Sequence, residues 1–164
     1  MNEPAYPARD GRVFFELARD RLTCQLETLD AVDNKIGMLF SVSTAMLGIL
    51  GAVLALNGGK LNGLEWAMTA LSVIGYIMVT FHARRAYAAK EWKVGGDLRK
   101  LWKLYSESDE DDRTLEWRVA NSLRIAYEAN QPDMTLKLGD LNVILASLVT
   151  QSLSLLVALL LVAG

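Results

Sequence analysis

Three long runs of apolar residues dominate the pattern of the chain: residues 36–56, 64–81 and 141–164. The first and third runs contain no ionisable side chain. At a helical rise of about 1.5 Å per residue, the first run crosses the roughly 30 Å hydrocarbon core of a bilayer. A water-soluble helix would interrupt such a run with polar residues on one face. The pattern therefore predicts an all-α membrane protein with three transmembrane helices and long cytoplasmic helical extensions.

The polar segments between these runs are also expected to be helical. Residues 11–35 carry apolar side chains at roughly helical spacing, and no proline or glycine separates this amphipathic segment from Ile36. We therefore expect it to continue unbroken into the first span. The sequence divides into an amphipathic helix (1–35), a transmembrane hairpin (36–81), a cytoplasmic helical region (82–140) and a third transmembrane helix (141–164).

Within the region 82–140, two helices are expected. The second span is predicted to continue as a helix through Tyr87, Trp92 and on to Tyr105. Another helix is predicted over 113–130. Pro132 is expected to end that helix or to restart one in its first turn, because proline lacks the N–H group that a helix interior needs.

The distribution of Lys and Arg predicts how the chain is oriented. Five of these residues precede the first span, one lies between the first and second, eleven lie between the second and third, and none follows the third. The positive-inside rule then places the N-terminus and the central helices in the cytoplasm, and the C-terminus outside.

Composition excludes several functional classes. The net charge of −2 disfavours nucleic-acid binding, and the single cysteine, Cys24, rules out an internal disulfide or a cysteine-rich metal site. The only histidine is His82, so a histidine-based metal centre or catalytic dyad is not expected. The chain contains no nucleophile elbow, Walker loop or dinucleotide fingerprint. We therefore expect no catalytic residues, no metal and no cofactor.

Polar residues gather where each span meets its predicted cytoplasmic side. The entrance to the first span carries Asp30, Asp33, Asn34 and Lys35. One interpretation is that these groups pair with residues near the other spans, for example Asp33 with Lys137. The other is that the cationic members form a pocket for an anionic ligand, since guanidinium groups suit phosphate. The candidate pocket residues are Arg84, Arg85, Lys90, Asn130 and Lys137.

Two stripes run along the apolar helices. Small residues on the first span let helix backbones approach closely in lipid, which is typical of a packing seam rather than a pore lining; they are Ser41, Thr44, Ala45, Gly48, Gly51 or Ala52, and Ala55. On the third span, Ser147, Gln151 and Ser154 share one face. This polar stripe is expected to face a neighbouring helix or a wet path, because hydrogen-bonding groups are not satisfied by lipid.

The order of elements resembles a known family. Asp33-Asn34-Lys35 enters the first span, a tight hairpin follows, and the helices after it contain Ala126-Tyr127-Glu128-Ala129-Asn130, then Lys137 and a last apolar helix. This arrangement resembles the membrane effectors of Pycsar, the pyrimidine-cyclase system of bacterial anti-phage defence. It is also similar to the two-transmembrane effector domains of other nucleotide-based defence systems.

The resemblance implies an inner-membrane protein that binds cyclic UMP or cyclic CMP made by a partner cyclase. The bound effector would oligomerise and disrupt the membrane, so that the infected cell dies before phage mature. No cyclic-nucleotide-binding β-barrel is recognisable, so a ligand would have to be held by helices, with Tyr87 or Trp92 available to stack on a base.

Two other functions are compatible with the residues. The stripe on the third span could belong to a constitutive channel or transport subunit, although no acidic residue lies deep inside a span, as a proton path would normally require. Alternatively, the polar helices could bind a partner protein, which would make the chain a membrane scaffold.

Overall fold

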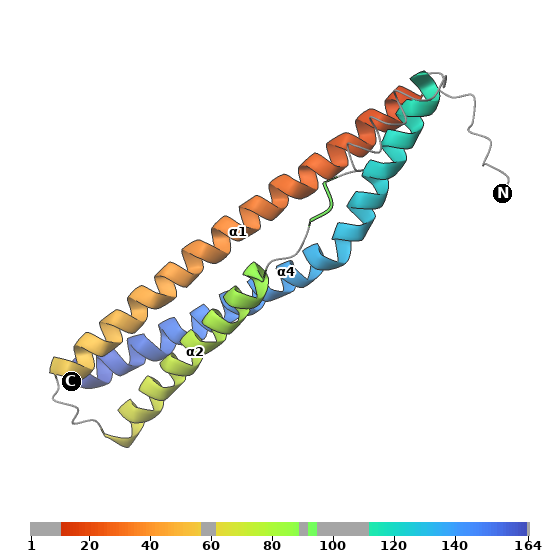
Figure 1. Cartoon of the computed structure of the whole chain (residues 1–164). Helices are drawn as coiled ribbons and strands as arrows, with labels where there is room; N and C mark the ends of the chain where they lie inside the picture. Colours follow the sequence, from red (N-terminus) through yellow and green to blue (C-terminus); the bar gives the residue numbers. More distant parts are fainter. Residues whose placement is uncertain (1–10, 57–61, 89–91, 95–111, 164) are drawn as a thin grey trace. The chain divides into compact units, whose positions relative to one another are not determined.

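The structure is a computed structural model, and it describes residues 11–56, 62–88, 92–94 and 112–163. These residues form three long helices and no strand: α1 (Gly11–Leu56), α2 (Gly63–Tyr87) and α4 (Asp112–Ala163) (Figure 1). Each helix contains a stretch long and apolar enough to cross a membrane. The prediction of an all-α membrane protein with three spanning helices is therefore confirmed, and the chain is a multi-pass membrane protein.

The amphipathic segment and the first span form one helix, as expected. Because residues 12–36 lack proline and glycine, nothing in the sequence interrupts the backbone hydrogen bonds, and α1 runs from Gly11 to Leu56 without a break. In the same way, α4 contains both the polar helix predicted over 113–130 and the third apolar run.

Contacts divide the chain into two compact units. Unit 1 consists of Met1–Leu29 and Lys90–Met134, and unit 2 consists of Asp30–Ala89 and Thr135–Gly164. Helices α1 and α4 each contribute to both units, whereas α2 lies wholly in unit 2.

In unit 1, the first part of α1 packs against the first part of α4. Phe14 stacks on Trp117 with ring centroids 4.9 Å apart. The buried residues of α1 that follow are spaced alternately by four and three positions, which is the heptad pattern of helices packed as a coiled coil; they are Ala18, Leu22, Gln25 and Leu29.

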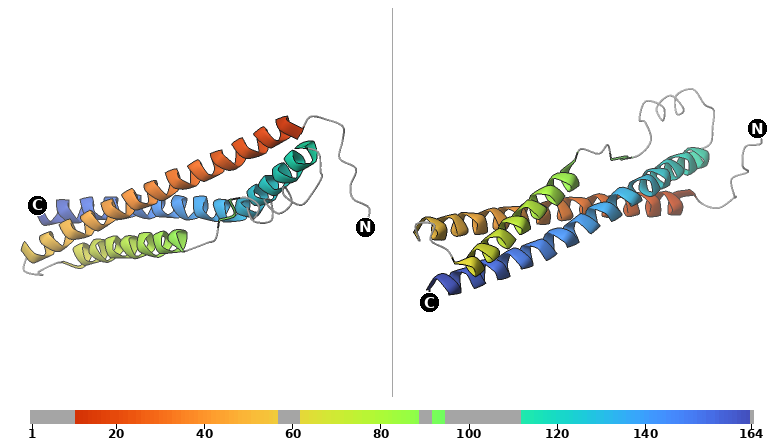
Figure 2. Two further views of the ribbon diagram at one scale, coloured as in Figure 1. Left: turned by 45° about the horizontal axis from the view of Figure 1, so that its top comes forward. Right: turned by 90° about the horizontal axis from the view of Figure 1, so that it is seen from below.

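In unit 2, the three apolar segments pack side by side (Figures 1 and 2). Their core contains Val32 and Ile36 from α1, Val79 and Ala83 from α2, and Ile144 from α4. Most other large apolar side chains of these segments are exposed on the outside of the unit, which is the arrangement expected for helices that face lipid.

The start of α2 is fixed by a reciprocal capping interaction. The Asn62 side chain accepts a hydrogen bond from the Glu65 backbone N–H at 3.0 Å, and the Glu65 carboxylate accepts one from the Asn62 backbone N–H at 2.7 Å. This capping box satisfies two backbone donors that would otherwise be left at the helix terminus. It explains why Glu65, an acid at the edge of an apolar span, is buried.

The predicted continuation of α2 to Tyr105 is wrong over the described residues. The helix ends at Tyr87, Ala88 has an extended backbone, and Trp92, Lys93 and Val94 are not helical. In unit 1, the Asn130 side chain accepts from the backbone N–H of Lys93 at 3.0 Å and donates to its C=O at 2.9 Å. Asn130 thus supplies both hydrogen bonds that a helix would have given Lys93. The remainder of the predicted extension, from Gly95 to Tyr105, lies outside the described residues.

The prediction that Pro132 ends or restarts a helix is also wrong, because α4 continues through it. Proline removes one backbone donor, so the Glu128 C=O loses its usual partner in the helix. Pro132 itself is exposed. The buried heptad contacts on the opposite side of α4, including Asn130 and Met134, continue across this position.

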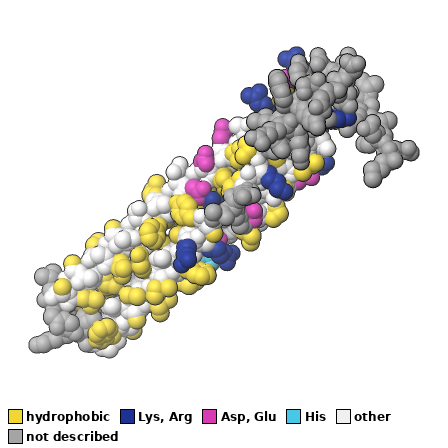
Figure 3. All heavy atoms as spheres, in the orientation of Figure 1, with side chains coloured by type: hydrophobic (Ala, Val, Ile, Leu, Met, Phe, Trp, Pro, Cys, Tyr) yellow, Lys and Arg dark blue, Asp and Glu magenta, His cyan; other side chains and the backbone are white. Residues whose placement is uncertain are grey.

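Charged side chains avoid the apolar part of unit 2. On the face shown in Figure 3, hydrophobic and uncharged side chains cover the spanning segments, while Lys, Arg, Asp and Glu side chains appear beyond them.

Candidate functional site

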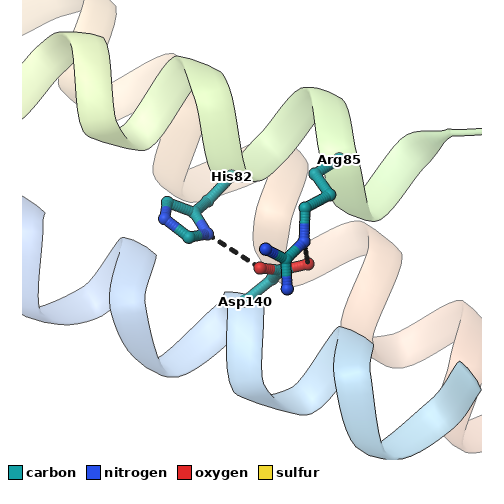
Figure 4. Close-up of polar contacts among 3 residues, drawn as sticks. All are labelled: His82, Arg85 and Asp140. Atoms are coloured by element: carbon teal, nitrogen blue, oxygen red, sulfur yellow. Dashed lines mark hydrogen bonds and ion pairs between the residues drawn. The ribbon is translucent and has the colours of Figure 1, made fainter. Parts of the chain in front are cut away.

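A carboxylate on α4 joins α4 to α2 in unit 2. The Asp140 side chain, only 4% exposed, lies 2.7 Å from His82 Nδ1 and accepts a hydrogen bond from Arg85 Nε at 3.1 Å (Figure 4). His82 and Arg85 are three residues apart on α2, so both point from one face of that helix toward Asp140. Arg85 is half exposed, and its stem crosses the surface to reach the buried carboxylate.

A second ion pair joins α1 to α4. Lys137 Nζ lies 2.5 Å from Asp33 Oδ1, and its side chain is 8% exposed against 31% for Asp33. This is the pair that the sequence predicted, and the prediction is confirmed. The positions fit because both residues flank apolar runs at the same membrane boundary, where a lysine buried against helices needs a carboxylate.

Tyr87 completes the connection between α2 and α1. Its hydroxyl donates a hydrogen bond to the Asp33 backbone C=O at 2.7 Å. A Cβ added at Gly37 would lie 3.1 Å from the Tyr87 hydroxyl oxygen, so the absence of a side chain at Gly37 allows this approach. The sequence suggests Tyr87 as an aromatic residue that stacks on a base. In the structure its hydroxyl joins two helices.

We call the residues that make these contacts the polar clamp: Asp33, His82, Arg85, Tyr87, Lys137 and Asp140. Every pair of helices in unit 2 is joined by one of them. Because each carboxylate lies against a cation or histidine, the charges of the clamp are largely matched internally. Its chemistry is that of an ion-paired junction between helices.

Several residues predicted to join this cluster do not. Asp30, Asn34, Lys35 and Arg84 are exposed, and among the residues that the structure describes none of the four has a hydrogen bond or ion pair with another helix. The reason is helical phase: Asp33 lies on the packed side of α1, whereas its neighbours point outward. Of the five candidate pocket residues, Arg85 and Lys137 contact carboxylates, Asn130 belongs to unit 1, and Lys90 lies outside the described residues.

The polar stripe on the third span faces a neighbouring helix. Gln151 is fully buried; its Nε2 donates to the Ser43 C=O at 3.0 Å, and its Oε1 accepts from the Ser43 hydroxyl at 2.5 Å. A Cβ on Gly75 of α2 would lie 3.1 Å from the Gln151 Cβ and 3.2 Å from the Ser147 C=O. Glycine therefore allows α2 to pack directly against this part of α4. Of the two interpretations of the stripe, the structure supports packing between helices.

We expect Gln151→Leu to lower the free energy of unfolding by about 1–2 kcal/mol, because hydrogen bonds between helices in a bilayer have roughly this strength. The substitution removes both bonds to Ser43 and introduces an apolar side chain of similar size. Denaturation in mixed SDS micelles measures the change. Thr150→Leu is the matched control, since Thr150 is exposed and its hydroxyl bonds only within α4. Equal stability of the two variants would contradict the role assigned to Gln151.

Sequence reasoning missed a second amide in a helix seam. Gln25 is buried in unit 1, where its Nε2 donates to Gln131 Oε1 at 3.2 Å and to the Tyr127 C=O at 3.3 Å. Its Oε1 accepts from Asn130 Nδ2 at 3.4 Å. The available signal was the heptad spacing, which places Gln25 between Leu22 and Leu29 on the packed side of α1.

The described ranges contain no group of three or more His, Cys, Asp or Glu side chains placed to hold a metal ion. Comparison with protein families, with curated proteins and with solved structures gives no match to this chain. The evidence for a function of this protein therefore comes from its residues, their geometry and the resemblance in the order of elements.

Proposed function

We propose that this protein is an anti-phage effector of the bacterial inner membrane. Cyclic UMP or cyclic CMP from a partner cyclase activates it, the protein oligomerises, and the membrane loses its integrity. It is not an enzyme, and its N-terminus lies in the cytoplasm with its C-terminus in the periplasm. The resemblance to the Pycsar membrane effectors motivates the nucleotide, and the distribution of Lys and Arg motivates the orientation.

One structural observation carries the oligomerisation step: the small-residue stripe of α1 is on the outside of unit 2. Its members Ser41, Thr44, Ala45, Gly48, Gly51, Ala52 and Ala55 are all exposed. A Cβ added at Gly48 or Gly51 would have no atom within 4 Å. The stripe is therefore not used to pack α1 against α2 or α4.

A stripe of this kind supports self-association in lipid. Membrane helices associate through close backbone approach at small residues, and burying an apolar face gives no advantage there because lipid is equally apolar. Small residues recur along α1 at spacings of four and three positions, the spacing of a left-handed helix pair. The occupant that fits best is the same stripe on a second copy of the chain.

The test is a membrane-potential assay in bacteria that produce the full chain. We expect depolarisation when cyclic UMP or cyclic CMP is supplied at micromolar concentration, and none with cyclic AMP or cyclic GMP. Depolarisation without any nucleotide would instead favour a constitutive channel. Unchanged potential under every condition, together with a stable protein complex, would favour a scaffold.

The channel alternative receives less support from the structure. It was motivated by Ser147, Gln151 and Ser154, yet Gln151 exchanges hydrogen bonds with Ser43 and Ser154 is buried with its hydroxyl bonded to the Thr150 C=O. A water-filled path needs polar groups that face a lumen. In unit 2 these groups face other helices.

A further inference from the structure

Unit 1 contains a groove between α1 and α4, built from two adjoining hollows. One, of about 350 Å³, is lined in part by Cys24, Gln25 and Gln131. The other, of about 240 Å³, is lined in part by Phe14 and Leu17. Arg21 and Tyr127 line both hollows, so the two lie next to each other. We call this feature the α1/α4 groove. Small-molecule sites in proteins begin at about 300 Å³, so its size is sufficient.

One hollow has a floor of fixed amide groups. Gln25, more than nine-tenths buried, is held by the Tyr127 C=O, Gln131 and Asn130. Asn130 is in turn fixed by both main-chain groups of Lys93. A polar floor that is already ordered loses little entropy when it binds a ligand. Two exposed side chains also line this hollow: the Gln131 Oε1 accepts from Gln25, and the Thr28 hydroxyl donates to the Cys24 C=O while keeping its lone pairs as acceptors.

The other hollow is apolar and partly aromatic. Phe14 and Tyr127 are both half buried there, next to Leu17 and Ala18. An aromatic wall beside an amide floor suits a ligand with a heteroaromatic ring, which can stack on one surface and hydrogen-bond along its edge.

Among the described residues that line the groove, Arg21 is a cation whose charge is not matched. Arg124 donates to Glu128 at 2.6 Å and to Asn121, so its charge is compensated. Arg21 is exposed at the junction of the two hollows, and within the described ranges it has no ion pair. One unmatched guanidinium calls for a ligand with a single negative charge, and a planar fork of donors suits a phosphate.

From this geometry we propose that the α1/α4 groove of unit 1 binds a monoanionic nucleotide, with the phosphate on Arg21 and the base between Tyr127 and the amide floor. The choice of a nucleotide rests on the function proposed above. A cyclic nucleoside monophosphate carries one negative charge, which matches the charge of Arg21. The site differs from the pocket expected at Arg84, Arg85, Lys90, Asn130 and Lys137: of those residues only Asn130 takes part, as support for Gln25.

Cys24 supplies a direct test, because it lines the groove, is exposed and is the only cysteine of the chain. The full-length protein, held in lipid nanodiscs, is labelled with a fluorescent maleimide in the presence of increasing cyclic UMP or cyclic CMP. We expect the nucleotide to slow labelling in a saturable manner. Arg21→Ala is expected to shift the protecting concentration upward by roughly 10- to 100-fold, because it removes a charged hydrogen bond.

Arg19→Ala is the matched control, since Arg19 is an exposed arginine on the same helix that lines neither hollow. It is expected to leave the protection curve unchanged. Each variant is compared with its own labelling rate in the absence of nucleotide, so a change in Cys24 reactivity alone does not affect the result. An equal shift for Arg19→Ala and Arg21→Ala would overturn the assignment.

The outcomes also separate the groove from the proposed function. If the nucleotide depolarises cells but neither protects Cys24 nor depends on Arg21, the groove is overturned and the function stands. If Cys24 is protected in an Arg21-dependent manner but no nucleotide depolarises cells, the groove is supported and the function fails. If neither effect occurs, both are overturned.

Discussion

Replacing Asp33 by alanine is expected to lower the free energy of unfolding by about 3–5 kcal/mol, the usual cost of removing one partner from a buried ion pair. The reason is the burial of Lys137, whose side chain is 8% exposed and whose ammonium group lies 2.5 Å from the Asp33 carboxylate. Without Asp33, the buried ammonium group loses the carboxylate that lies against it. Denaturation in mixed SDS micelles measures the loss.

Replacing Lys137 is expected to lower the free energy of unfolding by less than replacing Asp33. Lys137→Met is expected to cost less, about 1–3 kcal/mol, because the Asp33 carboxylate that it leaves behind is 31% exposed and can be hydrated. Asp30→Ala and Lys35→Met are matched controls: both residues were predicted at the same membrane entrance, and both are exposed. They are expected to change stability by less than about 0.5 kcal/mol. A loss in Lys35→Met as large as in Asp33→Ala would contradict the assignment of Asp33 to the packed side of α1.

The second large effect concerns the exposed stripe of α1. In the variant carrying Gly48→Leu and Gly51→Leu, we expect nucleotide-dependent depolarisation to be lost while the folded monomer remains as stable as the native one. Both glycines have open space around them within the monomer, so the leucines do not disturb its packing. A larger side chain in a closely packed helix–helix interface makes the free energy of association less favourable by about 1–3 kcal/mol. This weakens association roughly 5- to 150-fold at each interface.

The control adds the same bulk to another lipid-facing position. Ala70 is an exposed small residue in the span of α2, and Ala70→Leu is expected to leave depolarisation unchanged. Chemical cross-linking in membranes then reports the oligomer directly. Full depolarisation by the double glycine variant would remove the stripe as the self-association surface.

The elements that local sequence determines were predicted correctly. The apolar runs identify the three spanning helices because each is long and almost free of charge. The continuity of α1 follows from the absence of proline and glycine before Ile36. The Asp33–Lys137 pair could be anticipated because the two residues carry opposite charges and border apolar runs at one membrane boundary.

The incorrect predictions concern features that depend on distant residues. The end of α2 at Tyr87 gives no local signal, whereas the hydrogen bonds that hold Lys93 out of a helix come from Asn130, 37 residues away. Pro132 carries a strong local signal for a break, but the packed face of α4 continues through it. At the entrance to the first span, the side of α1 that packs against the other helices carries Asp33, whereas Asn34 and Lys35 lie on its exposed side.

The contact between Ser43 and Gln151 has a consequence for how the protein is made. These residues are 108 positions apart, so at a synthesis rate of about 5–20 residues per second Ser43 waits roughly 5–20 seconds for Gln151 to leave the ribosome. During that interval α1 and α2 have been synthesised, but the α4 residues that pack against them have not. The arrival of α4 then supplies, in one event, Lys137, Asp140 and Gln151. The last helix to be translated is therefore the one that locks the first two together.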